Sequence, residues 1–244
     1  MLIRKVFALT ILLCSFFITA TQAQKLKNFL DNTDTPFTWL GVDFTQARLL
    51  GDAAASPADI TRHFAGINDV IRNEPKKYDV PGAFKRSKVD FDVSETNERN
   101  ASVNTDKIKS EDAADYNRLK PEDITKLVKG YKFGDRKGIG VLFVMEAMSK
   151  TEKEAAMYVT VVDMGSRSVL MTERMTGKAQ GFGFRNYWAY TVHKVLEHID
   201  YKKWKEKYAN AQDPVEETPV APKKETKTAV AKEEKAKKAP KKKG

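Results

Sequence analysis

Cysteine is almost absent from this 244-residue chain, which contains only Cys14. A lipidated cysteine follows a small residue and becomes the mature N-terminus, whereas Cys14 follows Leu12 and Leu13 and precedes further apolar residues. We therefore do not expect a lipid anchor at this position. If the N-terminal segment is removed, no thiol remains, which excludes disulfides, thiolate metal sites and cysteine nucleophiles. An exported chain of this kind is typical of the bacterial periplasm or of secreted bacterial proteins.

Long hydrophobic runs are also scarce, and the longest covers only residues 6–20. This run of about 15 residues is shorter than the roughly 20 that a membrane-spanning helix needs. Arg4 and Lys5 precede the run and small residues ending at Ala23 follow it, which is the order found in secretory signal peptides. The sequence predicts a signal peptide over residues 1–23 and a chain that is not transmembrane once processed. A retained N-terminal anchor is the alternative.

Acidic residues are outnumbered, because 43 Lys and Arg residues accompany 33 Asp and Glu residues and give a net charge of +10. Much of this surplus lies in the signal peptide and in residues 211–244, where ten lysines accompany six acidic residues. Residues 24–210 are therefore only mildly basic, and together with predicted export this argues against a nucleic-acid partner.

The C-terminal residues 211–244 have no aromatic residue and few large aliphatic residues. Such a segment cannot repay its ordering entropy, so we expect a disordered tail rich in Lys, Ala, Pro and Glu. The lysines of residues 213–244 would attract anionic lipid, lipopolysaccharide or wall polymer. A tail that is simply solvated is the alternative.

Motifs of catalysis and cofactor binding are missing. No G-x-S-x-G nucleophile motif is present, and Gly177, Gly181 and Gly183 fit neither a dinucleotide-binding nor a P-loop spacing. We interpret these glycines as a turn that lets the last helix fold back on the sheet. An anion held by main-chain amides near Gly183 is the alternative.

Few residues could ligate a metal. His193 and His198 are five positions apart, about 140° around a helix, so both cannot bind one ion. His63 lies beside an apolar stripe, and the methionines that follow the signal peptide are interpreted as core filling. Glu146, Asp163 and Glu173 would form paired carboxylates for sugar chemistry only if the fold brought them together. We predict no cofactor, no metal and no catalytic residue, although an enzyme is not excluded.

What the sequence does contain is hydrophobic periodicity over residues 24–210. Residues 37–44 alternate as a strand, which predicts Leu40, Val42 and Phe44 on one face and Trp39, Gly41 and Asp43 on the other. The later elements are, in order, a helix over 56–74, a strand over 89–93, a short helix over 120–130, strands over 139–145, 157–162 and 169–175, and a helix over 184–208. The order β-α-β-α-β-β-β-α predicts a single α/β (α+β) domain with one mixed sheet of about five strands.

The long C-terminal helix is expected to pack on one face of this sheet. Its apolar stripe includes Trp188, and residues at the helix start lie outside that stripe. We predict Gly183, Arg185 and Tyr187 as candidate partner-binding residues. Residues 94–117 form a long hydrophilic connection, which is either disordered or a lid over a site.

Residues 158–189 contain a strand that ends in Val-Asp, a short turn, the strand Ser-Val-Leu-Met-Thr-Glu-Arg, a glycine and a long helix. This succession resembles the end of small α/β domains in bacterial envelope accessory proteins. These are the N-terminal domain of the Tol translocation protein, the curli secretion lipoprotein and the lipoprotein activators of penicillin-binding proteins. The resemblance implies an envelope protein-binding or scaffolding role. The alternative from another class is an envelope hydrolase or small-ligand-binding protein that uses residues 94–117 as a lid.

Overall fold

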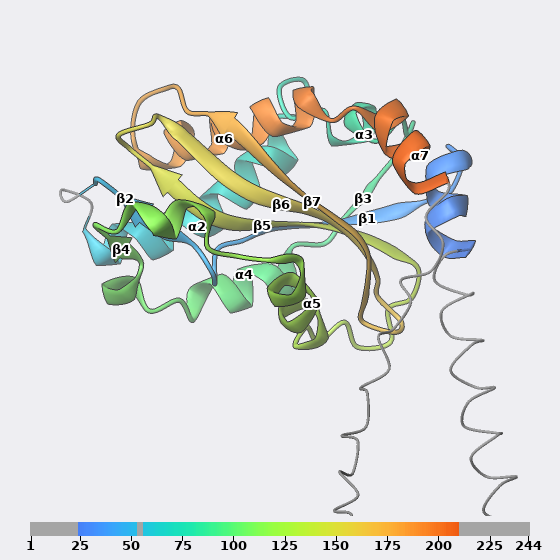
Figure 1. The fold of residues 1–244 in the computed structure, drawn as a ribbon, viewed down its shortest axis with the longest axis horizontal. Helices are drawn as coiled ribbons and strands as arrows, with labels where there is room; N and C mark the ends of the chain where they lie inside the picture. The colour runs from blue at the N-terminus through green and yellow to red at the C-terminus, as the bar shows by residue number, and fades with distance from the viewer. Residues whose placement is uncertain (1–23, 53–55, 210–244) are drawn as a thin grey trace, which may run out of the picture. The chain divides into compact units, whose positions relative to one another are not determined.

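The computed structural model describes residues 24–52 and 56–209. The predicted signal peptide and C-terminal tail therefore lie outside the described residues. The described chain has the predicted α/β fold, with one curled mixed sheet between two helical layers (Figure 1). Among these residues, no helix combines the length and apolar character needed to cross a membrane.

The sheet is built around its fully buried central strand, β5. Strands β1 and β2 lie one after the other along one side of β5, and β3 and β4 pair outside them, all in parallel. On the other side, β6 pairs antiparallel with β5, and β7 pairs antiparallel with β6. The strands are β1 (Phe37–Asp43), β2 (Arg48–Leu50), β3 (Asp90–Phe91), β4 (Lys109–Ser110), β5 (Ile139–Ser149), β6 (Glu154–Asp163) and β7 (Ser168–Lys178).

Two hydrophobic cores lie on opposite faces of the sheet. The larger includes Trp39, Phe143 and Trp188 under helices α2 and α6, and the smaller includes Leu142 and Tyr158 under α5. The helices are α2 (Pro57–Asn73), α3 (Val80–Ala83), α4 (Ser94–Ala101), α5 (Pro121–Lys129), α6 (Phe184–His198) and α7 (Tyr201–Ala209), with short 3-10 turns η1 (Thr105–Lys107) and η2 (Ala113–Asn117). Residues 24–31 are also helical.

The predicted facing of the first strand is wrong because β1 contains a bulge. Trp39 pairs with Val141 and Gly41 with Leu142, so Leu40 is an extra residue without a partner on β5. The extra residue reverses the alternation beyond it. Trp39 and Val42 therefore lie in the larger core, and Leu40 lies in the smaller one. Gly41 permits the bulge because its φ is 95°, a value that side chains disfavour.

The predicted C-terminal helix is two helices. Helix α6 ends at His198 and Ile199 has an extended ψ of 107°. Asp200 then begins α7 by accepting a hydrogen bond from the Lys203 main-chain nitrogen (2.9 Å), as an N-cap residue does. The break lets Tyr201 and Trp204 pack into the larger core.

Residues 94–117 are not a disordered connection. They form α4, η1, β4 and η2, with Thr96 and Asn100 buried. Helix α4 and helix α2 together close the outer edge of β1. The Val42 main-chain nitrogen donates to Asn68 Oδ1 and the Phe44 nitrogen donates to Asn100 Oδ1, each at 2.7 Å. Both asparagine side chains also donate to the Val42 carbonyl oxygen, so side chains complete the edge between β3 and β4.

Candidate functional site

The carboxyl ends of β2, β4 and β5 meet at one edge of the sheet, at Leu50, Ser110 and Ser149. Parallel strands of α/β proteins commonly place ligand sites outside such carboxyl ends. The turn between β5 and β6 and the loop between β7 and α6 lie at the same edge, because the Ala179 nitrogen donates to the Lys153 carbonyl oxygen (2.8 Å). This edge holds a cleft and an exposed aromatic side chain, and we take it as the candidate site.

The cleft has a volume of about 510 Å³, which suits a small molecule or one inserted side chain. Its lining combines hydroxyl groups, carboxylates and apolar surface from Leu50, Gly51, Ser110, Glu111, Ala113, Tyr116, Ser149, Thr151, Glu152 and Glu154. The carboxylates of Glu111 and Glu152 form no hydrogen bond or ion pair with another described residue. The cleft therefore offers uncompensated negative charge.

Glu154 anchors one wall of the cleft. Its carboxylate accepts a hydrogen bond from the Tyr116 hydroxyl (2.5 Å) and pairs with the Lys178 ammonium (2.9 Å). Burial by itself raises the pKa of Glu154, but these hydrogen bonds outweigh it and lower the pKa below its ordinary value. Burial and the bond to Glu154 raise the pKa of Tyr116 well above its usual range. The segment around η2 is therefore a fixed wall of the cleft.

A buried ion pair supports this wall from below. Arg174 on β7 donates from Nε to the Glu146 carboxylate and from a terminal nitrogen to the Tyr116 carbonyl oxygen, both at 2.7 Å. Glu146 is fully buried, and its other oxygen accepts the Leu119 main-chain N–H (2.5 Å). Every atom of the Glu146 carboxylate is thus occupied by a structural contact.

Phe182 is the feature of this edge that protrudes. Its side chain is 95% exposed, and it is the one large hydrophobic residue that is exposed among the described residues. It stands between Gly181 (φ 120°) and Gly183 (φ 74°). The next aromatic residue, Phe184, turns inward instead, with its ring stacked on His63 at 5.5 Å between centroids. Phe184 therefore holds the helix start in place and leaves Phe182 in solvent.

The structure does not bring the three predicted partner-binding residues into one patch. Gly183 caps α6 in a left-handed conformation. Tyr187 borders the turn after β5, where the Lys150 ammonium lies 4.0 Å from its ring centroid. Arg185 is exposed, hydrogen bonds to Asn186 and lies against Gly66 of α2. Positions two apart on a helix face different ways, so Tyr187 joins the site edge and Arg185 does not.

Sequence reasoning missed Phe182 and the cleft. A signal for Phe182 was present, since an aromatic residue between two glycines cannot belong to the apolar stripe of the following helix. No local signal could have found the cleft, because its walls come from three segments far apart in the chain.

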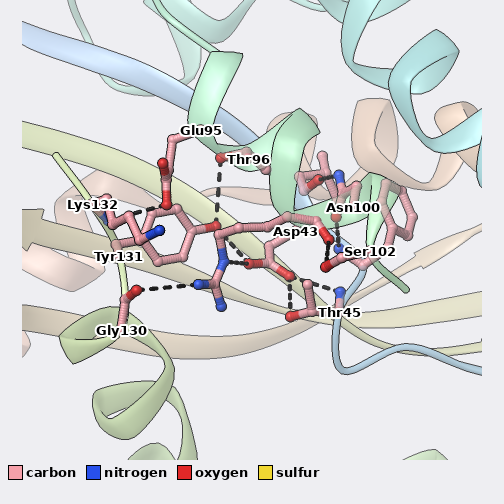
Figure 2. A network of polar contacts seen from close by, with 12 residues as sticks. Asp43, Thr45, Glu95, Thr96, Asn100, Ser102, Gly130, Tyr131 and Lys132 are labelled. Carbon is pink, nitrogen blue, oxygen red and sulfur yellow. Dashed lines mark hydrogen bonds and ion pairs between the residues drawn. The ribbon is translucent and has the colours of Figure 1, made fainter. Parts of the chain in front are cut away.

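A second polar network lies at the carboxyl end of β1 (Figure 2). The buried Asp43 carboxylate accepts from the Tyr131 hydroxyl and the Thr45 hydroxyl, both at 2.5 Å, and from Arg99 Nε at 3.2 Å. Arg99 also donates to the Gly130 carbonyl oxygen. Burial and the neighbouring Asp43 raise the pKa of Tyr131 well above its usual range. We interpret this network as a structural clamp between β1, α4 and the end of α5.

The three carboxylates considered for sugar chemistry are kept apart. Glu146 bonds to Arg174 on the face with the smaller core, whereas Glu173 bonds to Lys207 and Tyr208 on the opposite face. Asp163 lies at the far end of β6, where it pairs with Lys25 (2.6 Å). The fold therefore does not assemble them into a catalytic pair.

The histidines and methionines take structural positions. His193 contacts Glu197 (3.3 Å) and lies edge-on to Tyr78, and His198 is exposed at the end of α6. The methionines from 145 to 175 are distributed over the two cores. In the part of the chain that the structure describes, no group of three His, Asp or Glu side chains is arranged to hold a metal.

The candidate site is defined by the geometry of this chain's own residues. Comparison of the chain with protein-family models, with curated proteins and with solved structures finds no match.

Proposed function

We propose that this protein is an exported bacterial envelope protein that acts as a non-catalytic protein-binding or scaffolding module. Its contact surface is the loop of residues 179–183 together with Tyr187 at the start of α6. The observation that carries the proposal is the 95% exposure of Phe182 between two glycines of positive φ. The periplasmic or secreted location and the bacterial origin are part of the proposal and rest on the predicted signal peptide.

A phenylalanine that is exposed on a surface loop lowers solubility, so we expect this side chain to have a binding role. Aromatic side chains are the usual anchors of protein interfaces, because one ring buries a large apolar area in a partner's pocket. The same edge has exposed charged side chains, Lys178 and Glu152. An apolar anchor with a charged rim is the arrangement that protein-binding surfaces use.

The basic tail adds a second contact in this proposal. Residues 213–244 would hold the protein near anionic phospholipid, lipopolysaccharide or wall polymer, at about 1 kcal/mol per lysine close to a charged surface. Deletion of residues 213–244 should then release the protein from envelope fractions, and the loss should match the effect of raised salt on the intact chain. Fractionation that the deletion leaves unchanged would remove this part of the proposal.

Site-specific photocrosslinking tests the protein-binding role. A photoreactive phenylalanine analogue at Phe182 should give a discrete adduct with one envelope protein in cells. The matched control carries the analogue at Lys129, which is exposed at the end of α5 on the other face of the sheet. A Phe182→Ser variant should lose copurification of the same partner without a change in melting temperature. The proposal fails if Phe182 and Lys129 give the same adducts, or if the Phe182→Ser variant retains the partner.

The cleft supports a second candidate, a small-ligand-binding protein. Glu111 and Glu152 present unpaired carboxylates in a volume of about 510 Å³, which favours a positively charged organic ligand. In this version, residues 94–117 supply a fixed wall of the site. Native mass spectrometry of the freshly purified protein would favour this candidate if it shows a bound cationic metabolite that a Glu111→Gln, Glu152→Gln variant loses.

A further inference from the structure

The outer edge of β7 is open. Strand β7 is 11 residues long, and among the described strands it pairs only with β6. Apart from that ladder, no hydrogen bond joins its main-chain groups between Val169 and Gly177 to another described residue. Every second residue of such a strand presents an N–H and a carbonyl to solvent, and these groups are ready to pair with another strand.

The opposite edge of the sheet is protected from pairing with another strand. Its outermost strands, β3 and β4, have two residues each. Between them, the β1 edge is occupied by the buried amides of Asn68 and Asn100. Short strands and covered edges are the devices by which proteins prevent edge-to-edge association. Among the described residues, β7 is neither short nor covered in this way, and its one bulge, at Leu170, lies at the start of the strand.

The regular part of the β7 edge has defined limits. At its start, Leu170 is an extra residue, since Val161 pairs with Met171 and Val162 with Val169. At its end, the chain turns away after Lys178, where the Ala179 nitrogen bonds to Lys153. Residues 171–178 therefore form an uninterrupted edge of roughly 26 Å.

We propose that β7 pairs antiparallel with β7 of a second copy of this chain, about a two-fold axis at Met175. The two sheets become one continuous sheet in the dimer. This interface is independent of the proposed contact through Phe182.

The side chains select this register. A two-fold axis perpendicular to the sheet must pass through a residue, because opposite residues of an antiparallel pair share one face. An axis at Arg174 or at Glu173 places two like charges directly opposite, which destabilises a cross-strand pair. An axis at Thr172 reaches the bulge at Leu170 after one residue. An axis at Met175 pairs residues 172–178 of the two copies and leaves only Met171 of the regular edge without a partner.

At this register the cross-strand neighbours are compatible. Arg174 lies opposite Thr176 of the partner subunit, and Thr172 lies opposite the partner's Lys178. Glu173 lies opposite the partner's Gly177, which has no side chain. No pair combines two charges of one sign, so the edge is complementary to itself.

Sedimentation velocity of the purified full chain tests the dimer. A Thr176→Lys substitution adds a positive charge opposite the partner's Arg174, twice per dimer, and should weaken the Kd about five-fold or more. A Thr176→Glu substitution should instead strengthen the dimer. Both changes are on a half-buried surface position, so neither is expected to unfold the chain. A monomer at every concentration, or a dimer that responds equally to both variants, would overturn the proposal.

Single-cysteine crosslinking tests the register. In a Cys14→Ser background, a Met175→Cys variant places the two introduced thiols on the axis, about 5 Å apart at Cβ. Mild oxidation should then yield a disulfide-linked dimer. The matched control is Thr172→Cys on the same strand, whose two thiols would be offset by six residues, roughly 20 Å. Crosslinking at Thr172 and not at Met175 would refute the Met175 register.

Discussion

Gly177 on β7 lies directly against Thr191 on α6, and a Cβ built on the glycine would stand 2.1 Å from the Thr191 carbonyl oxygen. Helix α6 therefore crosses the sheet at a point where no side chain fits. Gly177 permits this close contact because it has no side chain. The turn into α6 is made four and six residues later by Gly181 and Gly183, which both have positive φ.

A Gly177→Ala substitution should destabilise the protein strongly, because the added methyl group meets main-chain atoms that cannot rotate away. We expect a loss of about 3 kcal/mol in the free energy of unfolding. Denaturant unfolding followed by tryptophan fluorescence measures it. Gly165→Ala is the matched control, since a Cβ there finds its nearest neighbour at 3.6 Å, and it should change stability by less than about 0.5 kcal/mol. Equal effects of the two substitutions would contradict the close helix crossing.

Replacement of Asn68 by alanine should expose the edge of β1. The Val42 N–H would be left buried without an acceptor, and we expect a cost of about 2 kcal/mol. Asn97→Ala removes only the hydrogen bond between Asn97 and Asn68 (2.8 Å), so it should cost a fraction of that. Hydrogen exchange of the Val42 amide gives a second readout, with faster exchange expected in Asn68→Ala alone.

An Arg174→Met substitution should destabilise the wall of the cleft because it leaves the buried Glu146 carboxylate without its cation. The Arg174 side chain is 26% exposed, so water compensates in part, and we expect a loss of about 2 kcal/mol. The double variant Glu146→Leu, Arg174→Met should recover part of that stability, since no charge then remains buried. A double variant less stable than Arg174→Met would show that the ion pair itself is not the cause. Dilute protein should be used, so that the proposed β7 dimer does not contribute.

The contribution of Glu154 to the anchoring of η2 should be lost at acid pH. The folded-state pKa of Glu154 is lower than its ordinary value of 4.5, so its stabilising contribution is complete above that pH and is lost as the pH falls through the folded-state pKa. A Glu154→Gln variant should therefore have a lower melting temperature than the wild type at pH 7. The difference should shrink below about pH 4.5. A difference that stays constant down to pH 2 would assign the effect to shape and not to charge.

Much of the fold could be predicted because the relevant signals are local. The unbroken apolar run from Ile139 to Met145 marks a strand buried on both faces, and the spacing of Ile60, Phe64 and Ile67 marks a helix with one buried stripe. The break between α6 and α7 also has a local cause, the cap at Asp200, which the continuous apolar pattern concealed. Of the predicted partner-binding residues, Gly183 and Tyr187 lie at the candidate site, whereas Arg185 faces α2.

The rest required contacts between distant residues. The bulge at Leu40 depends on the register of β1 against β5, and residues 94–117 take their structure from partners such as Glu154. The cleft exists because β2, β4 and β5 end together, and the open edge exists because no described element follows β7 in the sheet. By itself, the sequence determined the fold class and the main helices and strands, because these depend on composition and on residue spacing, and export stays a prediction. Only the tertiary structure decided which strand ends meet at the cleft and which strand edge stays exposed. Strand order and register are set by pairing between segments far apart in the chain.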